Sequence, residues 1–338
     1  MTVTDTGLLE DEFLELTDQY RRELFSHCYR MVGSVHDAED MVQETYLRAW
    51  RAYHGFEGRS TLRTWLYRIA TNTCLTSLEG RARRPLPTGL GAPRANPDDP
   101  LERREEVPWL EPVPDAMVAL AAPDPATVVA AQHSVRLALV AAMQHLPARQ
   151  RAVLVLRDVL AWSAAEVAEA LETSTAAVNS MLQRARAQLA EAGLSEDDIV
   201  EPTDPGMREM LDRYALALER KDVTALVELF TAEALWEMPP FTGWYQGPTD
   251  IGRLVDTQCP AGAGQLRMVP TAANGQAAFG MYMLSPDGVF HPFQLQVLEL
   301  TPAGISHVVA FFDLRLFPLF GLPPTLATDA TGAPPNSG

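Results

Sequence analysis

Apolar residues recur at three- to four-residue spacing over residues 10–80, which is the period expected of amphipathic helices. Three such faces follow one another along the chain, and they begin at Phe13, Met41 and Leu62. Ser34 and Asp37, residue types that start helices, precede the second face. The pattern predicts a first all-α domain over residues 10–84.

The composition changes after this domain. Residues 85–125 are rich in proline, glycine and acidic side chains, which predicts a flexible acidic linker. Helical periodicity then returns, and we expect a second all-α domain over residues 126–194.

The pattern changes again at residue 207. Residues 207–230 predict a helical hairpin. Short apolar runs separated by turn residues then predict strands at 234–238, 265–269, 276–284, 290–300 and 304–315. Helices followed by a curved antiparallel sheet indicate an α+β domain over residues 207–320. Residues 324–338 predict a disordered tail.

A chain of 338 residues is long enough for two or three small domains. It contains no apolar run of about 18 residues, and its acidic start does not resemble a signal peptide. Cys28, Cys74 and Cys259 are odd in number and far apart, which excludes a disulfide framework and a cysteine zinc site. These features predict a cytoplasmic protein with no membrane contact, no cofactor and no metal.

The net charge of −17 argues against nucleic acid as a partner, but the charge is unevenly distributed. Residues 43–84 carry eight arginines against three glutamates, so a basic segment lies in an acidic chain. Lys221 is the single lysine, and arginine suits bidentate contacts to phosphate and guanine. A GC-rich genome would produce the same bias without a functional meaning.

Residues 162–189 have the pattern of a helix-turn-helix. Ser163 and Glu166 occupy the positions of a capping box, and residues 172–174 form a turn before a second helix. That helix buries Val178 and Leu182 and leaves one side free for a DNA groove: Thr175, Ala176, Asn179, Gln183, Arg184 and Arg186. An ordinary helical hairpin with a solvated face would give the same pattern.

Aromatic residues alternate with arginines over residues 48–68, after a helix with crowded acidic residues at 37–44. Aromatic rings beside basic groups suit unstacked bases and a single-stranded backbone. Trp50 is better explained as a core residue. Phe56, in a loop between two glycines, is harder to explain in that way.

Together these segments resemble the two conserved domains of the extracytoplasmic-function (ECF) sigma factors of the sigma-70 family. The resemblance rests on DAEDMVQET at residues 37–45, FEGRSTLRTWLYRIATN at 56–72, PARQRAVLVLRD at 147–158 and RARAQL at 184–189. It covers residues 10–192. Thr76 is a departure, because the family usually has an aspartate there.

The resemblance implies binding to core RNA polymerase and to promoter DNA. It implies that the acidic helix docks on the largest polymerase subunit through Asp37, Glu39, Asp40, Gln43 and Glu44. It implies that the following loop and helix capture and face the melted upstream promoter element through Phe56, Arg59, Arg63, Trp65, Arg68 and Asn72. The distal element would be read by residues 174–186, beginning with Ser174.

Residues 207–317 resemble the SnoaL-like branch of the NTF2-like fold, a cone-shaped α+β domain. The matching stretches are residues 236–251, 273–283, 293–300 and 305–313. Some members are isomerases or hydrolases and others only bind ligands or partners, so the fold does not establish chemistry. Catalysis, small-ligand binding and contact with a protein surface all stay open. The candidate pocket residues are Trp236, Met238, Trp244, Tyr245, His291, Gln296 and Asp313.

The segment PWLEPVPD, residues 108–115, resembles a Trp-Leu-Pro motif of related fused sigma factors, with Glu111 as a departure. A tryptophan in an acidic, proline-rich segment suggests docking. We therefore hypothesise an intramolecular contact through which the C-terminal domain modulates the sigma domains. A glycine-rich motif of those relatives is absent, and residues 261–265 read AGAGQ.

The sequence thus predicts a multidomain fold: two all-α sigma domains, the second with a helix-turn-helix, and a C-terminal α+β NTF2-like cone. The predicted function is that of a sigma factor, and not of an enzyme, that binds core RNA polymerase and directs promoter-specific initiation. The alternative is an isomerase- or hydrolase-type enzyme, or a small-ligand-binding protein, that uses the cone. Several specific sigma motifs favour the first.

Overall fold

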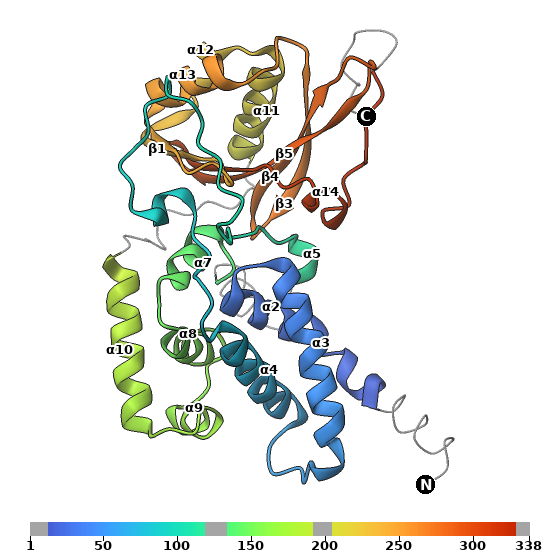
Figure 1. The fold of residues 1–338 in the computed structure, drawn as a ribbon, viewed down its shortest axis with the longest axis vertical. Helices are drawn as coiled ribbons and strands as arrows, with labels where there is room; N and C mark the ends of the chain where they lie inside the picture. Colours follow the sequence, from blue (N-terminus) through green and yellow to red (C-terminus); the bar gives the residue numbers. More distant parts are fainter. Residues whose placement is uncertain (1–12, 119–133, 192–204, 329–338) are drawn as a thin grey trace. The chain divides into compact units, whose positions relative to one another are not determined.

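The computed structural model describes residues 13–118, 134–191 and 205–328. The chain divides into two compact units that are each discontinuous in sequence. Unit 1 consists of residues 1–85 and 110–194, and unit 2 of residues 86–109 and 195–338 (Figure 1). Parts of the predicted boundaries, including residues 119–133 of the linker and second domain, lie outside the described residues.

The first helical part of unit 1 contains three packed helices, α2 (Arg21–Val32), α3 (Val35–Ala52) and α4 (Leu62–Leu78). Ser34 caps α3 by accepting a hydrogen bond from the Asp37 amide at 3.1 Å. Helix α2 is buried along most of its length.

The second helical part of unit 1 carries the helix-turn-helix. Helix α10 packs on α8 and on α9, and α8 also contacts α4 of the first part. Arg151 of α8 is buried and donates hydrogen bonds to the Met31 carbonyl and to Gln144. The elements are α5 (Asp115–Val118), α7 (Leu137–Gln144), α8 (Ala148–Leu154), a π-helical turn (Val155–Val159), α9 (Ala164–Ala170) and α10 (Thr175–Glu191).

Unit 2 is built on a six-stranded sheet in the order β2-β1-β6-β5-β4-β3. The neighbouring pairs are antiparallel except β1 and β6, which are parallel, so the prediction of a purely antiparallel sheet is wrong. The parallel pair arises because β1 and β6 are distant in sequence and need no hairpin. The strands are β1 (Phe230–Glu237), β2 (Trp244–Gln246), β3 (Leu266–Ala273), β4 (Gln276–Leu284), β5 (Phe290–Thr301) and β6 (Gly304–Phe311).

Three helices, α11 (Pro205–Arg220), α12 (Val223–Val227) and α13 (Pro248–Gln258), lie along one face of this sheet (Figure 1). Strand β2 and helix α13 are elements that the sequence pattern did not predict. Phe279 and Met281 of β4 belong to the core on the helical face.

The C-terminal segment covers the opposite face, because alternate strand residues point to opposite sides. Gly280 faces Leu322 and Phe317, and a Cβ there would come within 2.6 Å of Leu322. Tyr282 packs on Phe317 of α14 (Leu316–Leu319) and donates a hydrogen bond to the Pro323 carbonyl.

The prediction of a disordered tail from residue 324 is wrong for residues 324–328. Leu326 pairs with Phe290 in an isolated β-bridge, and the Thr328 hydroxyl bonds to the Gly288 carbonyl. The apolar segment before them anchors these residues on the sheet. Residues 329–338 lie outside the described part of the chain.

The prediction of a flexible linker is wrong for residues 86–109, which belong to unit 2. The Ala95 amide donates to the Trp244 carbonyl at 2.8 Å, and the Arg104 amide donates to the Pro240 carbonyl at 2.9 Å. Proline and glycine end regular elements, but they do not prevent a segment from finding backbone partners on a neighbouring loop. We call residues 86–109 the docked linker.

Side chains also hold the docked linker. Arg253 of α13 is paired with Asp98 at 2.6 Å, and Gln258 donates to the Pro97 carbonyl. At its start, the short 3₁₀ helix Pro87–Leu90 meets the end of β1. None of the helices in the described part of the chain has the length and apolar character needed to cross a membrane.

Candidate functional sites

The helix-turn-helix of unit 1 has the capping that its sequence predicts. The Ser163 hydroxyl accepts a hydrogen bond from the Glu166 amide, and the Glu166 carboxylate accepts one from the Ser163 amide, which completes a capping box. Glu172 takes a positive φ of 50° in the turn. Ser174 then accepts a hydrogen bond from the Ala177 amide at the start of α10.

Helix α10 has one buried side and one exposed side. Val178, Leu182 and Ala185 are buried. The residues predicted to enter a DNA groove are all exposed: Ser174, Thr175, Ala176, Asn179, Gln183, Arg184 and Arg186. Arg186 makes a two-point ion pair with Asp158 at 2.7 and 3.0 Å. Because an exposed ion pair contributes little free energy, a phosphate can replace that carboxylate.

The predicted base-capture loop lies before α4. The Phe56 ring packs on the Trp65 ring with centroids 4.9 Å apart, and both side chains are half-buried. Phe56 is therefore a loop residue with a packing partner. Arg59 is exposed beside Glu57.

The basic residues of α4 have acidic partners. Arg63 donates to Glu23 and lies over the Tyr67 ring at 4.9 Å from its centroid. Arg68 lies 3.6 Å from Glu169 of the helix-turn-helix. Asn72 is half-buried on the same helix. The basic segment is thus largely neutralised within unit 1.

The acidic helix α3 presents the residues predicted to bind polymerase. Asp40 and Gln43 are exposed, whereas Glu39 is paired with Arg21 and Glu44 with Arg48.

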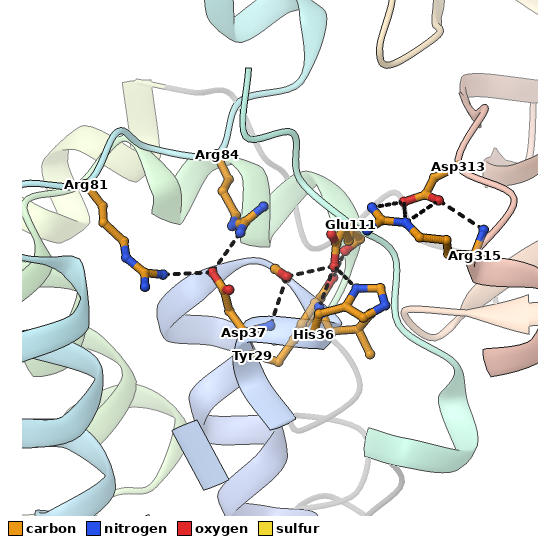
Figure 2. Close-up of polar contacts among 10 residues, drawn as sticks. Tyr29, His36, Asp37, Arg81, Arg84, Glu111, Asp313 and Arg315 are labelled. Atoms are coloured by element: carbon orange, nitrogen blue, oxygen red, sulfur yellow. Dashed lines mark hydrogen bonds and ion pairs between the residues drawn. The ribbon is translucent and has the colours of Figure 1, made fainter. Parts of the chain in front are cut away.

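Asp37 lies at the start of the same helix, between two arginines. It accepts hydrogen bonds from Arg84 at 2.7 Å and from Arg81 at 3.2 Å (Figure 2). Arg84 is less exposed than Arg81, so the two pairs differ in their access to solvent.

Glu111 has a structural role at the start of α3 that the sequence pattern did not predict. Its carboxylate accepts hydrogen bonds from the Ser34 hydroxyl at 2.7 Å and from the Val35 amide at 3.0 Å, and it lies 3.1 Å from His36 (Figure 2). The Tyr29 hydroxyl donates to the Glu111 carbonyl. Glu111 therefore supplies a negative charge at the N-terminus of α3. Its departure from the related motif was the only signal in the sequence.

Unit 2 contains a cavity of about 310 Å³ between the helices and the sheet. Three of the predicted pocket residues, Trp236, Met238 and Gln296, line it. Phe241, Phe293, Phe312, Leu254 and Met281 add apolar wall, and Leu101 and Arg103 of the docked linker lie at its edge.

The other predicted pocket residues lie elsewhere in unit 2. Trp244 donates its indole hydrogen to the Ala92 carbonyl of the docked linker, and Tyr245 is buried in the core outside the cavity wall. The sequence pattern could not place them because the loop between β1 and β2 reverses the chain there.

His291 and Asp313 do not form a catalytic pair. His291 lies 2.8 Å from Asp287, and Asp313 forms a two-point ion pair with Arg315 (Figure 2). Each side chain pairs with a charged residue close to it in sequence, and neither lines the cavity.

Buried charge lies instead at the end of β1. Glu237 is 1% exposed and accepts hydrogen bonds from the Thr88 amide at 2.9 Å and from Thr88 Oγ1. Its second oxygen lies 2.9 Å from His307 Nε2. Burial lowers the pKa of His307, but the Glu237 hydrogen bond and charge outweigh it and raise the pKa above its ordinary value.

Comparisons with known proteins agree with this architecture. Residues 16–84 match the family Sigma-70 region 2, and residues 136–189 match Sigma-70, region 4. The chain is 60% identical over 317 residues, 93% of its length, to the ECF RNA polymerase sigma factor SigG of Mycobacterium tuberculosis (strain ATCC 25618 / H37Rv), of which it covers 85%.

The same organism supplies a second relative and a structure. The chain is 31% identical over 287 residues to the ECF RNA polymerase sigma factor SigJ, and the match covers 80% of this chain and 80% of SigJ. The crystal structure of SigJ matches with a TM-score of 0.59 at 23% identity, covering 91% of this chain and 99% of that one.

Two sigma-70 regions in one helical unit define a transcription initiation factor. The chain belongs to the ECF RNA polymerase sigma factors. Sigma factors of this kind bind core RNA polymerase and promoter DNA, and they are not enzymes. The C-terminal domain combines helices with a mixed sheet, which confirms the predicted α+β class, and the fold of the chain is like that of SigJ.

Proposed function

We propose that this sigma factor recognises its promoter with two surfaces of unit 1, and that its NTF2-like domain restrains initiation by holding the docked linker. The exposed side of α10 supports the first part. The hydrogen bonds from Thr88 to Glu237 support the second.

The exposed side of α10 reads the distal promoter element. The polar residues on this side project from a helix whose opposite side is fixed in the core by Val178 and Leu182. A recognition helix held in this way suits the major groove. Arg184 and Arg186 supply contacts to phosphate or guanine.

The Phe56 loop and α4 bind the melted upstream element. The Phe56 and Trp65 rings contact each other at an angle of 37°, and an unpaired base can stack on one ring in place of the other. On binding DNA, Arg63 leaves Glu23 and Arg68 leaves Glu169, and each arginine binds a phosphate instead. The pairing of Arg68 with Glu169 links the two promoter-binding surfaces in the free protein.

The acidic side of α3 docks on core polymerase. Asp40 and Gln43 are exposed for such a contact, and Asp37 becomes available when Arg81 or Arg84 moves to another anion. This places the protein in the cytoplasm, with the polymerase.

The docked linker carries the proposed restraint. It connects the two sigma regions, and an extended segment of its length could span on the order of 80 Å. While the linker is bound to unit 2, it cannot extend to that length. The two sigma regions, which contact separate promoter elements, then cannot move as far apart. Undocking therefore precedes full engagement of both elements.

The test compares transcription by sigma variants with purified core polymerase. A genome-wide binding profile supplies a cognate promoter. Combining Thr88→Pro with Asp98→Ala removes the amide donor to Glu237 and the partner of Arg253, and we expect more transcript than with the unchanged protein. The matched control is Asp212→Ala, an exposed carboxylate of unit 2 outside the docked linker.

Two outcomes would count against the proposal. Failure of the unchanged protein to bind core polymerase would refute the assigned role of α3. Equal transcription from the linker variant, with protease digestion showing that its linker has been released, would refute the restraint.

A further inference from the structure

We propose that the cavity of the NTF2-like domain binds a neutral, mostly apolar small molecule that carries a hydrogen-bond acceptor, and that this molecule stabilises the docked linker. The coupling to the linker rests on the proposed function, whereas the binding itself does not.

The cavity has the size and wall of a small-molecule site. Its volume of about 310 Å³ lies at the lower end of the range of about 300–1,000 Å³ that such sites occupy. Phenylalanine, leucine and methionine side chains form most of the wall. A flat aromatic or fused-ring molecule therefore fits better than a flexible polar one.

Two buried donors in the wall lack a partner among the described residues. Trp236 is 3% exposed, and its Nε1 makes no hydrogen bond. Gln296 is fully buried, and its Oε1 accepts from the Tyr214 hydroxyl at 2.7 Å, which leaves its Nε2 unpaired. Since an indole nitrogen can only donate, the missing partner of Trp236 is an acceptor such as a carbonyl oxygen.

A third polar group supplies the complementary function. Gln294 is 6% exposed, lines the cavity, and has an Oε1 without a hydrogen-bond partner. An unpaired buried polar atom costs free energy, so a ligand that pairs with all three side chains gains affinity from each. The site therefore suits a molecule with a carbonyl at one end and a weaker donor along its edge.

The charge around the cavity favours a neutral ligand. Arg103 is the charged residue of the described cavity wall, and it is already paired with Glu105. Its guanidinium also lies over the Phe241 ring, 5.9 Å from the centroid. A carboxylate in the cavity would find no unpaired cation there and would lose its hydration.

The docked linker forms one edge of the site. Leu101 packs against the core and Arg103 forms a β-bridge with Phe241, and both line the cavity. A molecule inside therefore touches the linker and the domain together. By linkage, a ligand that binds the docked state better than the undocked state increases the docked population.

Binding is tested on the full chain with prodan, a neutral fluorophore that has a naphthalene ring and a ketone. We expect a saturable blue shift and enhancement of prodan emission. Cys259→Trp should abolish both, because this half-buried residue lines the cavity, and its backbone carbonyl, which accepts a hydrogen bond from Lys221, is kept in the variant. Equal prodan binding by Cys259→Trp would overturn the site.

The acceptor is tested by displacement of prodan with acetylnaphthalene and ethylnaphthalene, both substituted at the β position. Acetylnaphthalene should displace prodan at about tenfold lower concentration, as expected for one hydrogen bond in a dry site. Trp236→Phe should remove that difference, and Tyr245→Phe, a buried ring outside the cavity wall, should keep it. Tighter displacement by β-naphthoate would show an anion site and overturn the neutral ligand.

The coupling is tested by trypsin cleavage after Arg103 and Arg104 in the docked linker. Prodan should slow this cleavage several-fold, and Leu101→Ala should reduce both prodan affinity and protection. Prodan binding without protection refutes the coupling but keeps the ligand site. Slow cleavage with no prodan binding refutes the site but keeps the restraint by the linker.

Discussion

The buried carboxylate of Glu237 accepts a hydrogen bond from the backbone amide of Thr88 at 2.9 Å, across 149 positions of sequence. Glu237 is the last residue of β1 in unit 2, whereas Thr88 lies in the segment between the two sigma regions. The other carboxylate oxygen lies 2.9 Å from Nε2 of His307 in β6. A single buried side chain thus joins the sheet of the appended domain to the linker of the sigma factor.

Replacing Glu237 with glutamine should loosen the docked linker. The amide keeps one acceptor but loses the charge that strengthens the bonds to Thr88 and His307, at a cost of about 1–3 kcal/mol. Hydrogen exchange should become faster at residues 86–90. Glu233→Gln, an exposed residue of the same strand, should leave this exchange unchanged. Equal protection in both variants would show that Glu237 does not hold the linker.

The pair of His307 and Glu237 should stabilise unit 2 in mild acid. The folded-state pKa of His307 is raised above its ordinary value of 6.5. Its contribution is therefore fully present below that value and is lost as the pH rises through the folded pKa. Urea unfolding of unit 2, followed by hydrogen exchange at several pH values, should show this loss. His307→Gln should remove it, whereas His291→Gln, at an exposed pair, should not.

His27 should make unit 1 sensitive to acid. Burial, helped by the charge of Arg30, lowers the pKa of His27 from 6.5 to about 3. The unfolded chain then binds a proton that the folded chain excludes, so stability falls as the pH drops from 6.5 toward about 3, by about 1.4 kcal/mol per unit.

The measurement for His27 is the unfolding free energy of unit 1 at about pH 7.5 and about pH 5.5. His27→Gln, which can keep the hydrogen bond to Thr71, should flatten the dependence. His54→Gln alters an exposed imidazole and serves as the control. A slope that survives in His27→Gln would assign the acid sensitivity to another group.

Glu111→Ala should destabilise unit 1 by about 1–2 kcal/mol, the range of a lost helix cap with a favourable charge at the helix start. The alanine leaves the Val35 amide and the Ser34 hydroxyl without their carboxylate partner. Thermal unfolding with purified full-length protein measures the change. Glu106→Ala, an exposed acid of the docked linker, should have little effect, and similar melting of both variants would contradict the cap.

Arg184→Ala should weaken promoter binding by the holoenzyme and reduce its salt slope by about one, if the side chain contacts phosphate. Gln183→Ala should instead lose discrimination between promoter sequences, at about 1–3 kcal/mol for the affected base. Fluorescence anisotropy with labelled promoter DNA at several salt concentrations separates the two effects. Arg213→Ala, on an exposed side of α11, is the control.

The sequence determined the local features of this protein. Helical period placed α2, α3 and α4, and short-range chemistry placed the Ser163 capping box and the buried and exposed sides of α10. Such features depend on residues three or four positions apart. The sigma motifs are also local, and they sufficed to identify the family.

Tertiary structure alone decided what depends on distant residues. The parallel pairing of β1 with β6, the docking of residues 86–109 and the cap supplied by Glu111 join segments between about 70 and 150 positions apart. The sequence supplied Trp236 and Gln296 as pocket candidates, but only packing showed that Trp236 Nε1 and Gln296 Nε2 have no partner among the described residues and that the linker forms one edge of the cavity. A hydrogen-bonding group bonds whichever partner the fold brings within about 3 Å, and sequence spacing does not reveal that partner.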